Sequence, residues 1–434
     1  MGPAEVALLL FGLFGVLIVM RVPVAFALGL ACIPVFFIDQ RLTPFLLLNE
    51  MLKSYNSFIL LAVPFFLLAA NLMNYAGITD KLIELARTSV GHLPGGLGHV
   101  NVSVSMLFAG ISGSSTADSA GVGGVLIPAM KKEGYDAPFS VAITACSSVM
   151  GVIIPPSILM IVWGGVISVS IGGLFLAGVV PGVLIALSLM GAVLIFAKRR
   201  GYPVYARATL REFLGAVARA VVPLLMPAII VGGIVGGIFT PTEASVVAVL
   251  YALLLGLFVY RTLEISRIPA VLYESGRFAS ITLFCVGTAS AFGWILAYFH
   301  VPQMFVDAVS GLGGGVTSVG FIVAVCFLVV GCFIDAIPAI IILGTILAPL
   351  ADSVGMHPVH FAMIGIMSIA FGLVTPPYGL CLLISASLGG ISVRQAMRDT
   401  FFLLAPMLAV LIFVIVFPGA ILALPRWIMP QFVQ

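Results

Sequence analysis

Apolar runs separated by short polar breaks fill most of this chain, and one break joins two runs that are too short to span a bilayer. The runs cover 99–111 and 119–130, about 12 or 13 residues each, and the stretch from Gly110 to Asp118 carries four hydroxyls, two glycines and a carboxylate. A helix of that length is roughly 20 Å long, whereas a bilayer core is roughly 30 Å thick. The pattern predicts a re-entrant helical hairpin over 97–132, because a polar tip at membrane depth needs protein or a water-filled cavity around it. A kinked site packed closely through small residues is the alternative.

The rest of the first half is predicted to be helical. The expected elements are scaffold helices within 1–75, interrupted by a mixed polar stretch at 39–53, an arm helix at 79–90, a broken helix at 137–168 and a helix at 172–197. In the arm helix, Leu82, Ile83 and Ala86 share one face, as in an amphipathic helix at a membrane surface. The broken helix follows from Pro155 and Pro156, which remove two backbone donors and disfavour helix in the residue before them.

A basic linker at 198–219 separates this half from a second half with the same pattern. The expected elements there are scaffold helices within 220–259, a linker and helix at 261–299, a hairpin at 316–350, a broken helix at 359–390 and a last helix at 401–424. Adding 221 to residues of the first hairpin and its broken helix gives identical residues in the second half, at Gly331, Ser368, Gly372, Pro376 and Pro377. A collinear series of this kind indicates an internal repeat of 1–197 in 220–434.

The repeat is predicted to be inverted. Each half holds about five crossings and one hairpin, and an odd number of crossings places the halves in opposite orientations. With the basic linker in the cytoplasm, all of the 19 Lys and Arg except Arg41, Lys53 and Arg426 lie inside, which is the asymmetry that membrane proteins show. The first hairpin then enters from the cytoplasm and the second from outside. Inverted repeats with broken helices at matching positions point to a secondary transporter.

Composition supports the membrane assignment. Of the 434 residues, 62% are hydrophobic and 8% are charged, whereas soluble domains average about 25% charged residues. We therefore expect an all-α polytopic membrane protein in contact with lipid. The net charge of +3 is too small to indicate nucleic acid, and the six cysteines lie in apolar runs without a CxxC pair, as small packing residues do.

The hairpin tips and Pro-Pro breaks concentrate the polar groups of the apolar runs. Their hydroxyls and carbonyls suit cations such as Na⁺, and helix N-termini at the breaks favour an anionic substrate. Asp335 is an intramembrane carboxylate and therefore a functional candidate, with a hydrogen-bonded structural carboxylate as the alternative. Asp118 either belongs to the site or caps the second helix of its hairpin. Glu243 is interpreted as a structural carboxylate at a helix N-terminus.

Two other functions compete with transport. Gly110-Ile111-Ser112-Gly113 matches the GxSG pattern of rhomboid intramembrane serine proteases, but such an enzyme needs a histidine base at the depth of its serine. The five histidines fall near predicted loop ends. A passive anion channel is the second alternative, and a channel would not need two inverted hairpins.

Four motifs together resemble the large membrane subunit of TRAP transporters, the DctM type. They are FAGISGSSTADSAGVGGVLIPAMKKEGY, GVIIPPSILMIVWGG, GIFTPTEASVVAVLYAL and GLVTPPYGLCLL. The resemblance covers essentially the whole chain. It implies an elevator-type, Na⁺-driven importer in a bacterial or archaeal inner membrane. A separate small four-helix membrane subunit and a periplasmic substrate-binding protein would be its partners, and organic anions such as C4-dicarboxylates, sialic acid or sulfonates its substrates.

The resemblance also implies the site residues. One Na⁺ site would involve Ser112, Ser114, Ser115, Gly151 and Pro155. The other would involve Gly331, Asp335, Gly372, Thr375 and Pro376. Substrate contacts are expected from Thr116, Ser157, Ser368 and Tyr378, where Ser368 occupies a position at which many relatives carry Asn.

Overall fold

The protein is built from helices. The computed structural model describes residues 2–39, 41–310 and 314–430, and every regular element in these ranges is a helix. Seven of the described helical segments are long and apolar enough to cross a membrane. The predicted all-α polytopic class is therefore confirmed. Residues 311–313, which precede the second predicted hairpin in the sequence, lie outside the described residues.

The chain begins with short helices. They are α1 (Pro3–Val19), α2 (Val24–Cys32), α3 (Val35–Ile38), α4 (Pro44–Tyr55), α5 (Ala62–Tyr75) and α6 (Ile78–Val90), with a 3-10 turn at Phe58–Leu61 before α5. Helix α4 fills most of the mixed polar stretch for which no helix was predicted. Pro44 at its first turn favours a helix start, and Phe45, Leu48 and Leu52 form an exposed apolar stripe at helical spacing.

A helical hairpin occurs where the first was predicted. Its arms are α7 (Gly96–Ser112) and α8 (Ser115–Lys132), joined through Gly113, whose φ of 63° is a left-handed conformation that glycine adopts without strain. A broken helix follows: α9 (Ala137–Ser148), a 3-10 turn (Val149–Val152) and α10 (Ile158–Ile167), with a cis peptide between Pro155 and Pro156. Helix α11 (Ile171–Arg200) then crosses back.

The second half opens with α12 (Leu210–Val235), α13 (Pro241–Leu254), α14 (Ile268–Tyr298) and α15 (Val301–Ser310). The basic linker is shorter than the predicted 198–219, since α11 runs to Arg200 and α12 begins at Leu210. Thr209 and Glu212 form a capping box that starts α12 early. Thr240 and Glu243 start α13 in the same way, so Glu243 holds a helix N-terminus.

The chain ends with a second hairpin, a second broken helix and two further helices. These are α16 (Val316–Gly331) and α17 (Ala336–Ser353), α18 (Pro358–Gly372) and α19 (Leu380–Gly389), and α20 (Val393–Val416) and α21 (Pro418–Ile428). The last helix, predicted at 401–424, is therefore two helices. A capping box of Ser392 and Gln395 starts α20 early, and Pro418 begins α21 after the break at Phe417.

Helix boundaries repeat at the offset found in the sequence. Helices α8 and α17 coincide at both ends when 221 is added, and α7, α9, α10 and α11 each begin within one residue of α16, α18, α19 and α20. The two hairpins and the two broken helices therefore have matching helix boundaries along the chain. The opposite orientation of the two halves in a membrane stays a prediction.

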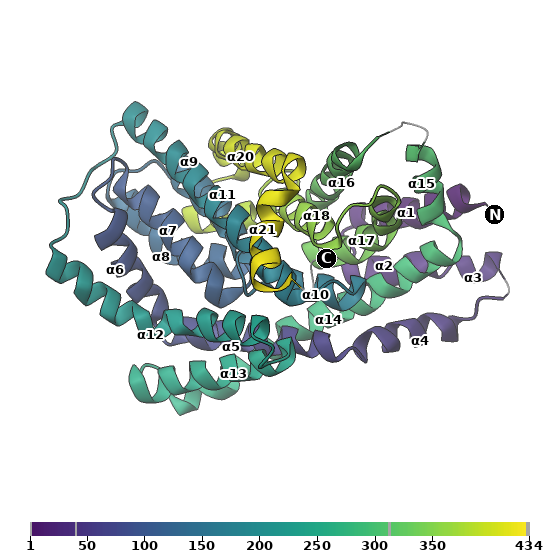
Figure 1. Cartoon of the computed structure of the whole chain (residues 1–434), viewed down its shortest axis with the longest axis horizontal. Helices are drawn as coiled ribbons and strands as arrows, with labels where there is room; N and C mark the ends of the chain where they lie inside the picture. Colours follow the sequence, from purple (N-terminus) through teal and green to yellow (C-terminus); the bar gives the residue numbers. More distant parts are fainter. Residues whose placement is uncertain (1, 40, 311–313, 431–434) are drawn as a thin grey trace.

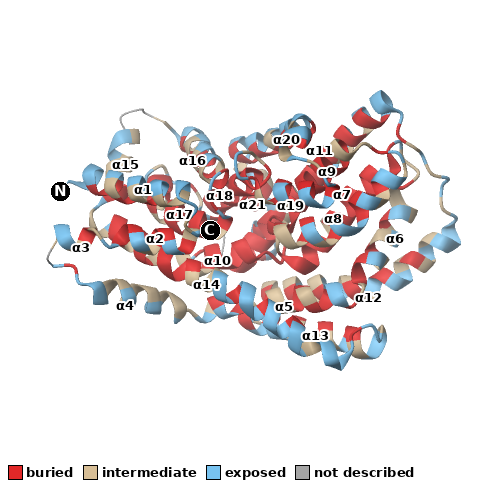
Figure 2. Cartoon of the chain, turned by 180° about the vertical axis from the view of Figure 1, so that it is seen from behind, coloured by how far each residue is buried: buried red, intermediate tan, exposed pale blue. Residues whose placement is uncertain are grey.

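The hairpins lie against a row of helices. Helices α12, α5, α14 and α4 run along one side of the molecule, and α13 packs outside this row on α5 (Figure 1). The first hairpin lies over one end of the row and the second over the other, and the broken helices meet between them (Figure 1). Buried residues concentrate in this central region, whereas α4 and α13 expose much of their surface (Figure 2).

Candidate functional site

The tip of the first hairpin is held by serine hydroxyls. Ser114 is the N-cap of α8, and its Oγ accepts a hydrogen bond from the Ala117 N–H at 3.4 Å. The Ser114 N–H in turn donates to Ser112 Oγ at 3.3 Å. The unpaired N–H groups of the first turn of α8 therefore point toward the tip, where they favour negative charge.

Asp118 is buried directly behind this tip. Its side chain is fully buried, and Oδ1 accepts a short hydrogen bond from the Ser112 hydroxyl. Oδ2 has no hydrogen-bond partner among the described residues. The cap of α8 is Ser114, so the interpretation of Asp118 as that cap is wrong. A buried carboxylate oxygen without a partner is costly, and a bound cation or a proton would remove that cost.

The first Pro-Pro break packs against the tip through glycines. The Ile158 N–H, which starts α10, donates to the Gly113 carbonyl at 3.2 Å. A Cβ on Gly151 would collide with Asp118 Oδ2 and would lie 3.0 Å from the Ser114 carbonyl carbon. The predicted first site is therefore brought together by tertiary packing: Ser112, Ser114 and Gly151 are neighbours around Asp118.

The second hairpin is capped by a carboxylate. Asp335 is the N-cap of α17, and its Oδ1 accepts a hydrogen bond from the Ala336 N–H at 2.8 Å. The second break lies against it, since a Cβ on Gly372 would be 2.7 Å from Gly331 Cα. The Tyr378 N–H donates to the Cys332 carbonyl at 3.0 Å. Gly331 and Gly372 are thus in contact, as the sequence predicted for the second site.

Thr375 lies in this break, and its hydroxyl already donates its hydrogen to a backbone carbonyl. Thr375 Oγ1 donates to the Phe371 carbonyl at 2.7 Å, which leaves its lone pairs free to accept or to coordinate. Its backbone N–H donates to the Gly372 carbonyl at 3.0 Å. Pro376 follows and forms a cis peptide with Pro377, as Pro155 does with Pro156 in the first break.

A cavity of about 370 Å³ lies between the two tips. Its polar lining comes from Ser114, Ser115, Thr116, Thr282 and Asp335, and the side chain of Asp335 is accessible from it. Its apolar walls come from α5, α14, the start of α17 and the two broken helices: Val63, Leu67, Val152, Ile158, Leu159, Phe278, Ile281, Ala336, Ile337, Leu373, Leu380 and Ile384. Four predicted site residues therefore meet in one space, with two helix N-termini and one carboxylate facing it.

Three predicted substrate contacts lie outside the cavity lining. Ser157 is buried as the N-cap of α10 and donates to the Val152 carbonyl at 2.7 Å. Ser368 is buried and donates to the Ile364 carbonyl at 2.7 Å, one turn back in α18. Tyr378 is 43% exposed but does not line this cavity. Of the four predicted substrate contacts, Thr116 alone lines the cavity.

Sequence reasoning missed the helices that close the cavity and a buried polar network between α7 and α9. Val63 and Leu67 are ordinary apolar residues of α5, so nothing in their pattern marks them. The network joins α7 to α9: Asn101 Nδ2 donates to Thr144 Oγ1 at 2.7 Å, and Ser147 Oγ donates to Asn101 Oδ1 at 2.9 Å. A buried asparagine inside an apolar run was the available signal.

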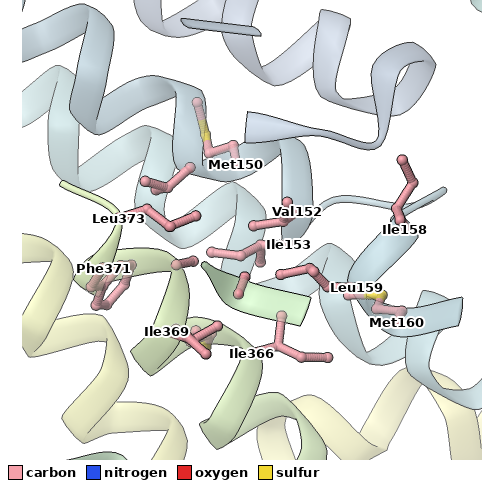
Figure 3. Close-up of a cluster of buried hydrophobic side chains, with 14 of the residues drawn as sticks. Met150, Val152, Ile153, Ile158, Leu159, Met160, Ile366, Ile369, Phe371 and Leu373 are labelled. Atoms are coloured by element: carbon pink, nitrogen blue, oxygen red, sulfur yellow. The ribbon is translucent and has the colours of Figure 1, made fainter. Parts of the chain in front are cut away.

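The two breaks also pack on each other through an apolar cluster. Met150, Val152 and Ile153 of the first break lie beside Ile369, Phe371 and Leu373 of the second (Figure 3). All six are buried. A dry interface of this kind makes the two broken helices one packed unit.

The chemistry of the site is that of oxygen ligands. No group of three or more His, Cys, Asp or Glu side chains that could hold a metal ion occurs in the described ranges. Ser112 donates to a carboxylate, Asp118, and the hydrogen bonds of His99 and His360 go to backbone carbonyls. The arrangement around Ser112 therefore lacks the serine–histidine pair of a protease.

The fold and the site define a polytopic membrane transporter built on paired helical hairpins. MtrF of Neisseria gonorrhoeae, a solved membrane transporter, shares this fold with a TM-score of 0.56 at 14% identity, over 84% of this chain and 83% of its own. The chain belongs to the family described as the tripartite ATP-independent periplasmic transporter, DctM component, which matches residues 11–420. It is therefore the inner-membrane permease subunit of a multi-component transporter, not an enzyme.

Two characterised relatives are similar over most of their length. The sialic acid TRAP transporter large permease protein SiaM of Vibrio cholerae is 37% identical over 417 residues, which cover 96% of this chain and 97% of SiaM. The C4-dicarboxylate TRAP transporter large permease protein DctM of Pseudomonas aeruginosa is 37% identical over 379 residues, 87% of this chain and 89% of DctM. Identity at this level assigns the family, and the predicted resemblance is confirmed.

Proposed function

We propose that this permease imports a small organic anion together with Na⁺, and that the cavity between the hairpin tips is where both are held. The main support for this proposal is that Ser114, Ser115, Thr116 and Asp335 line the same cavity. Hydroxyl and carboxylate oxygens suit Na⁺, and the N-termini of α8 and α17 favour an anion. The cavity of about 370 Å³ fits a small carboxylate or sulfonate.

The substrate class follows from relatives and from charge. SiaM and DctM are named for sialic acid and C4-dicarboxylates, both of which are carboxylates. Asp335 faces the same cavity, and a carboxylate beside an anionic substrate would repel it. A cation bound at Asp335 removes the repulsion, so substrate binding would depend on Na⁺ at that position.

Two or more Na⁺ ions would supply the driving force. Each ion that enters down a potential of roughly 100 mV contributes about 2.3 kcal/mol, and a tenfold concentration gradient contributes about 1.4 kcal/mol more. Import of a monoanion against the same potential costs about 2.3 kcal/mol, so two ions leave about 5 kcal/mol and support accumulation by roughly three to four powers of ten when leak is small.

The packing supports an elevator mechanism in which the hairpins and broken helices move as one body. The breaks share a buried apolar interface (Figure 3). Lys131, at the end of the first hairpin, donates from Nζ to the Gly389 carbonyl at the end of α19 at 2.9 Å. Helices α5 and α14, which wall the cavity from the other side, belong to the row that would stay fixed.

A reconstituted transport assay tests the proposal. The permease is placed in proteoliposomes with a separate small four-helix subunit, and a periplasmic binding protein is added outside. Uptake is measured for a carboxylate and sulfonate panel in Na⁺ or K⁺ buffer. We expect uptake only with Na⁺ and with all components. Equal uptake in K⁺ buffer would rule out Na⁺ coupling, and equal uptake without the binding protein would rule out dependence on it.

A further inference from the structure

A second cavity, of about 310 Å³, lies where α11 ends and α20 begins. Three arginines line it: Arg199 and Arg200 from the last turn of α11, and Arg398 from the start of α20. Helices α11 and α20 run side by side over this region (Figure 1). The cavity is separate from the transport site, with which it shares no lining residue.

One of the three arginines is already neutralised. Arg200 binds Asp399 with two parallel hydrogen bonds, Nη2 to Oδ1 at 2.7 Å and Nη1 to Oδ2 at 2.8 Å. Its Nη1 also donates to Asp136 at 2.5 Å. Arg199 and Arg398 form no salt bridge with any described residue, so both guanidinium groups are available to an anion, and the cluster stays net positive when Asp136 and Asp399 are counted.

Each free arginine has an apolar neighbour four residues away on the same helix face. Ile195 precedes Arg199 in α11, and Phe402 follows Arg398 in α20. Residues four apart lie one above the other. Both apolar side chains line the cavity, and they are 44% and 38% exposed. Phe402 also makes an edge contact with Phe196, with ring centroids 4.9 Å apart.

The order of charge and apolar surface matches the membrane boundary. Helix α11 ends at its basic turn and α20 begins there, so both arginines lie at the same membrane face and both apolar side chains lie one turn deeper. The basic residues assign this face to the cytoplasm. A ligand that fills the cavity must therefore be anionic at the surface and apolar just below it.

We propose that this cavity binds an anionic phospholipid, with the phosphodiester between Arg199 and Arg398 and an acyl chain along Ile195 and Phe402. Arginine forks bind phosphate oxygens in pairs, and basic pockets between transmembrane helices on the cytoplasmic side recognise such headgroups. Inorganic phosphate would satisfy the arginines but would leave the apolar floor of the cavity unfilled. The bound lipid would tie α11 to α20 beside the Arg200–Asp399 pair.

Native mass spectrometry of the purified full-length permease with its membrane partner tests the proposal. Phosphatidylglycerol, phosphatidylcholine or inorganic phosphate is titrated into the parent, into R199Q/R398Q and into a matched control, K198Q/R394Q. The control removes the same charge from the same helices at residues outside the cavity lining. Arg199 and Arg398 are exposed, so both variants are expected to fold.

We expect the parent to bind phosphatidylglycerol in preference to phosphatidylcholine. R199Q/R398Q should weaken that binding by about 30-fold, since each arginine bonded directly to the phosphodiester contributes roughly fivefold, and K198Q/R394Q should bind as the parent does because its residues make no such contact. Equal losses in the two double variants would show a general charge effect and overturn the site. Equal binding of the two lipids, or occupancy by inorganic phosphate at the same concentration as lipid, would overturn the lipid assignment.

Discussion

Ser114 and Asp335 occupy the same position in the two hairpins, the N-cap of the second helix, 221 residues apart. Both face the cavity between the tips. One tip therefore presents a neutral hydroxyl and the other a carboxylate. The acidic residue of the first hairpin, Asp118, lies one turn further along α8, fully buried. The two halves are equivalent in backbone but not in charge, so the two proposed cation sites should respond differently to mutation.

Asp335→Asn should lower the affinity for Na⁺ without unfolding the permease. Asparagine caps a helix about as well as aspartate, so α17 should keep its start while the charge is lost. Loss of a charged ligand costs about 1.5–3 kcal/mol, which raises the half-saturating Na⁺ concentration roughly 10- to 100-fold. Uptake against Na⁺ concentration, with expression and assembly checked in parallel, measures this. An activation curve that overlays the parent's would refute a role for Asp335 in Na⁺ binding.

Substitutions at Ser114 should separate helix capping from ion binding. Ser114→Ala removes both the cap and the oxygen, whereas Ser114→Asn restores a cap with a larger side chain. Ser114→Ala with Ser115→Ala should insert and assemble with the small subunit but show reduced uptake and a raised Na⁺ requirement. If Ser114 acts only as a cap, Ser114→Asn should restore the parent's Na⁺ dependence. Continued impairment in Ser114→Asn supports the ligand role.

Gly372→Ala should disrupt the contact between the second hairpin and its break. The added Cβ would lie 2.7 Å from Gly331 Cα, and backbone cannot move aside cheaply. Overpacking of this kind costs about 1–3 kcal/mol. A thermal melt of the purified permease should show a lower transition temperature, and uptake should fall. Gly124→Ala in α8 is the control, because its Cβ meets nothing within 4 Å; a similar loss there would contradict the packing argument.

Cysteine labelling should place the two hairpins on opposite membrane faces. Lys131 is engaged with the Gly389 carbonyl, so its exposed neighbour Lys132 is the better probe, and Asp352 is the exposed counterpart near the end of α17. Lys132→Cys should react from the cytoplasm and Asp352→Cys from outside with an impermeant reagent. The described native cysteines are buried or partly buried, which keeps the background low. Labelling of both from one face would show that the repeat is not inverted.

A cross-link between hairpin and row should stop transport if the hairpins move. Leu67 of α5 and Thr116 of α8 line the same cavity from opposite sides. In Leu67→Cys/Thr116→Cys, a short bifunctional thiol reagent with a reducible link should block uptake, and reduction should restore it. Each single variant treated with the same reagent is the control. Full uptake by a cross-linked double variant would argue against an elevator.

Local chemistry made much of the architecture predictable from the sequence. Helix α7 ends at Gly113, which adopts the left-handed conformation of the turn, and α8 starts at a serine cap. Two consecutive prolines interrupt both long helices wherever they occur. Capping boxes at Thr209 and Ser392 start α12 and α20 earlier than the apolar pattern alone predicts.

Only the tertiary structure decided the roles of the two acidic residues of the hairpins, Asp118 and Asp335. A carboxylate and a serine in the same turn are both competent caps, so sequence alone left Asp118 between two roles. The close approach of Gly151 holds Asp118 behind the tip and leaves the cap to Ser114. The apolar walls from α5 and α14, and the self-contained hydrogen bonds of Ser157 and Ser368, likewise depend on folding. Helix boundaries arise from contacts between residues a few positions apart, so a local pattern can predict them. A cavity is formed by segments more than 200 residues apart in the sequence, and no local pattern shows that these segments lie close together in space.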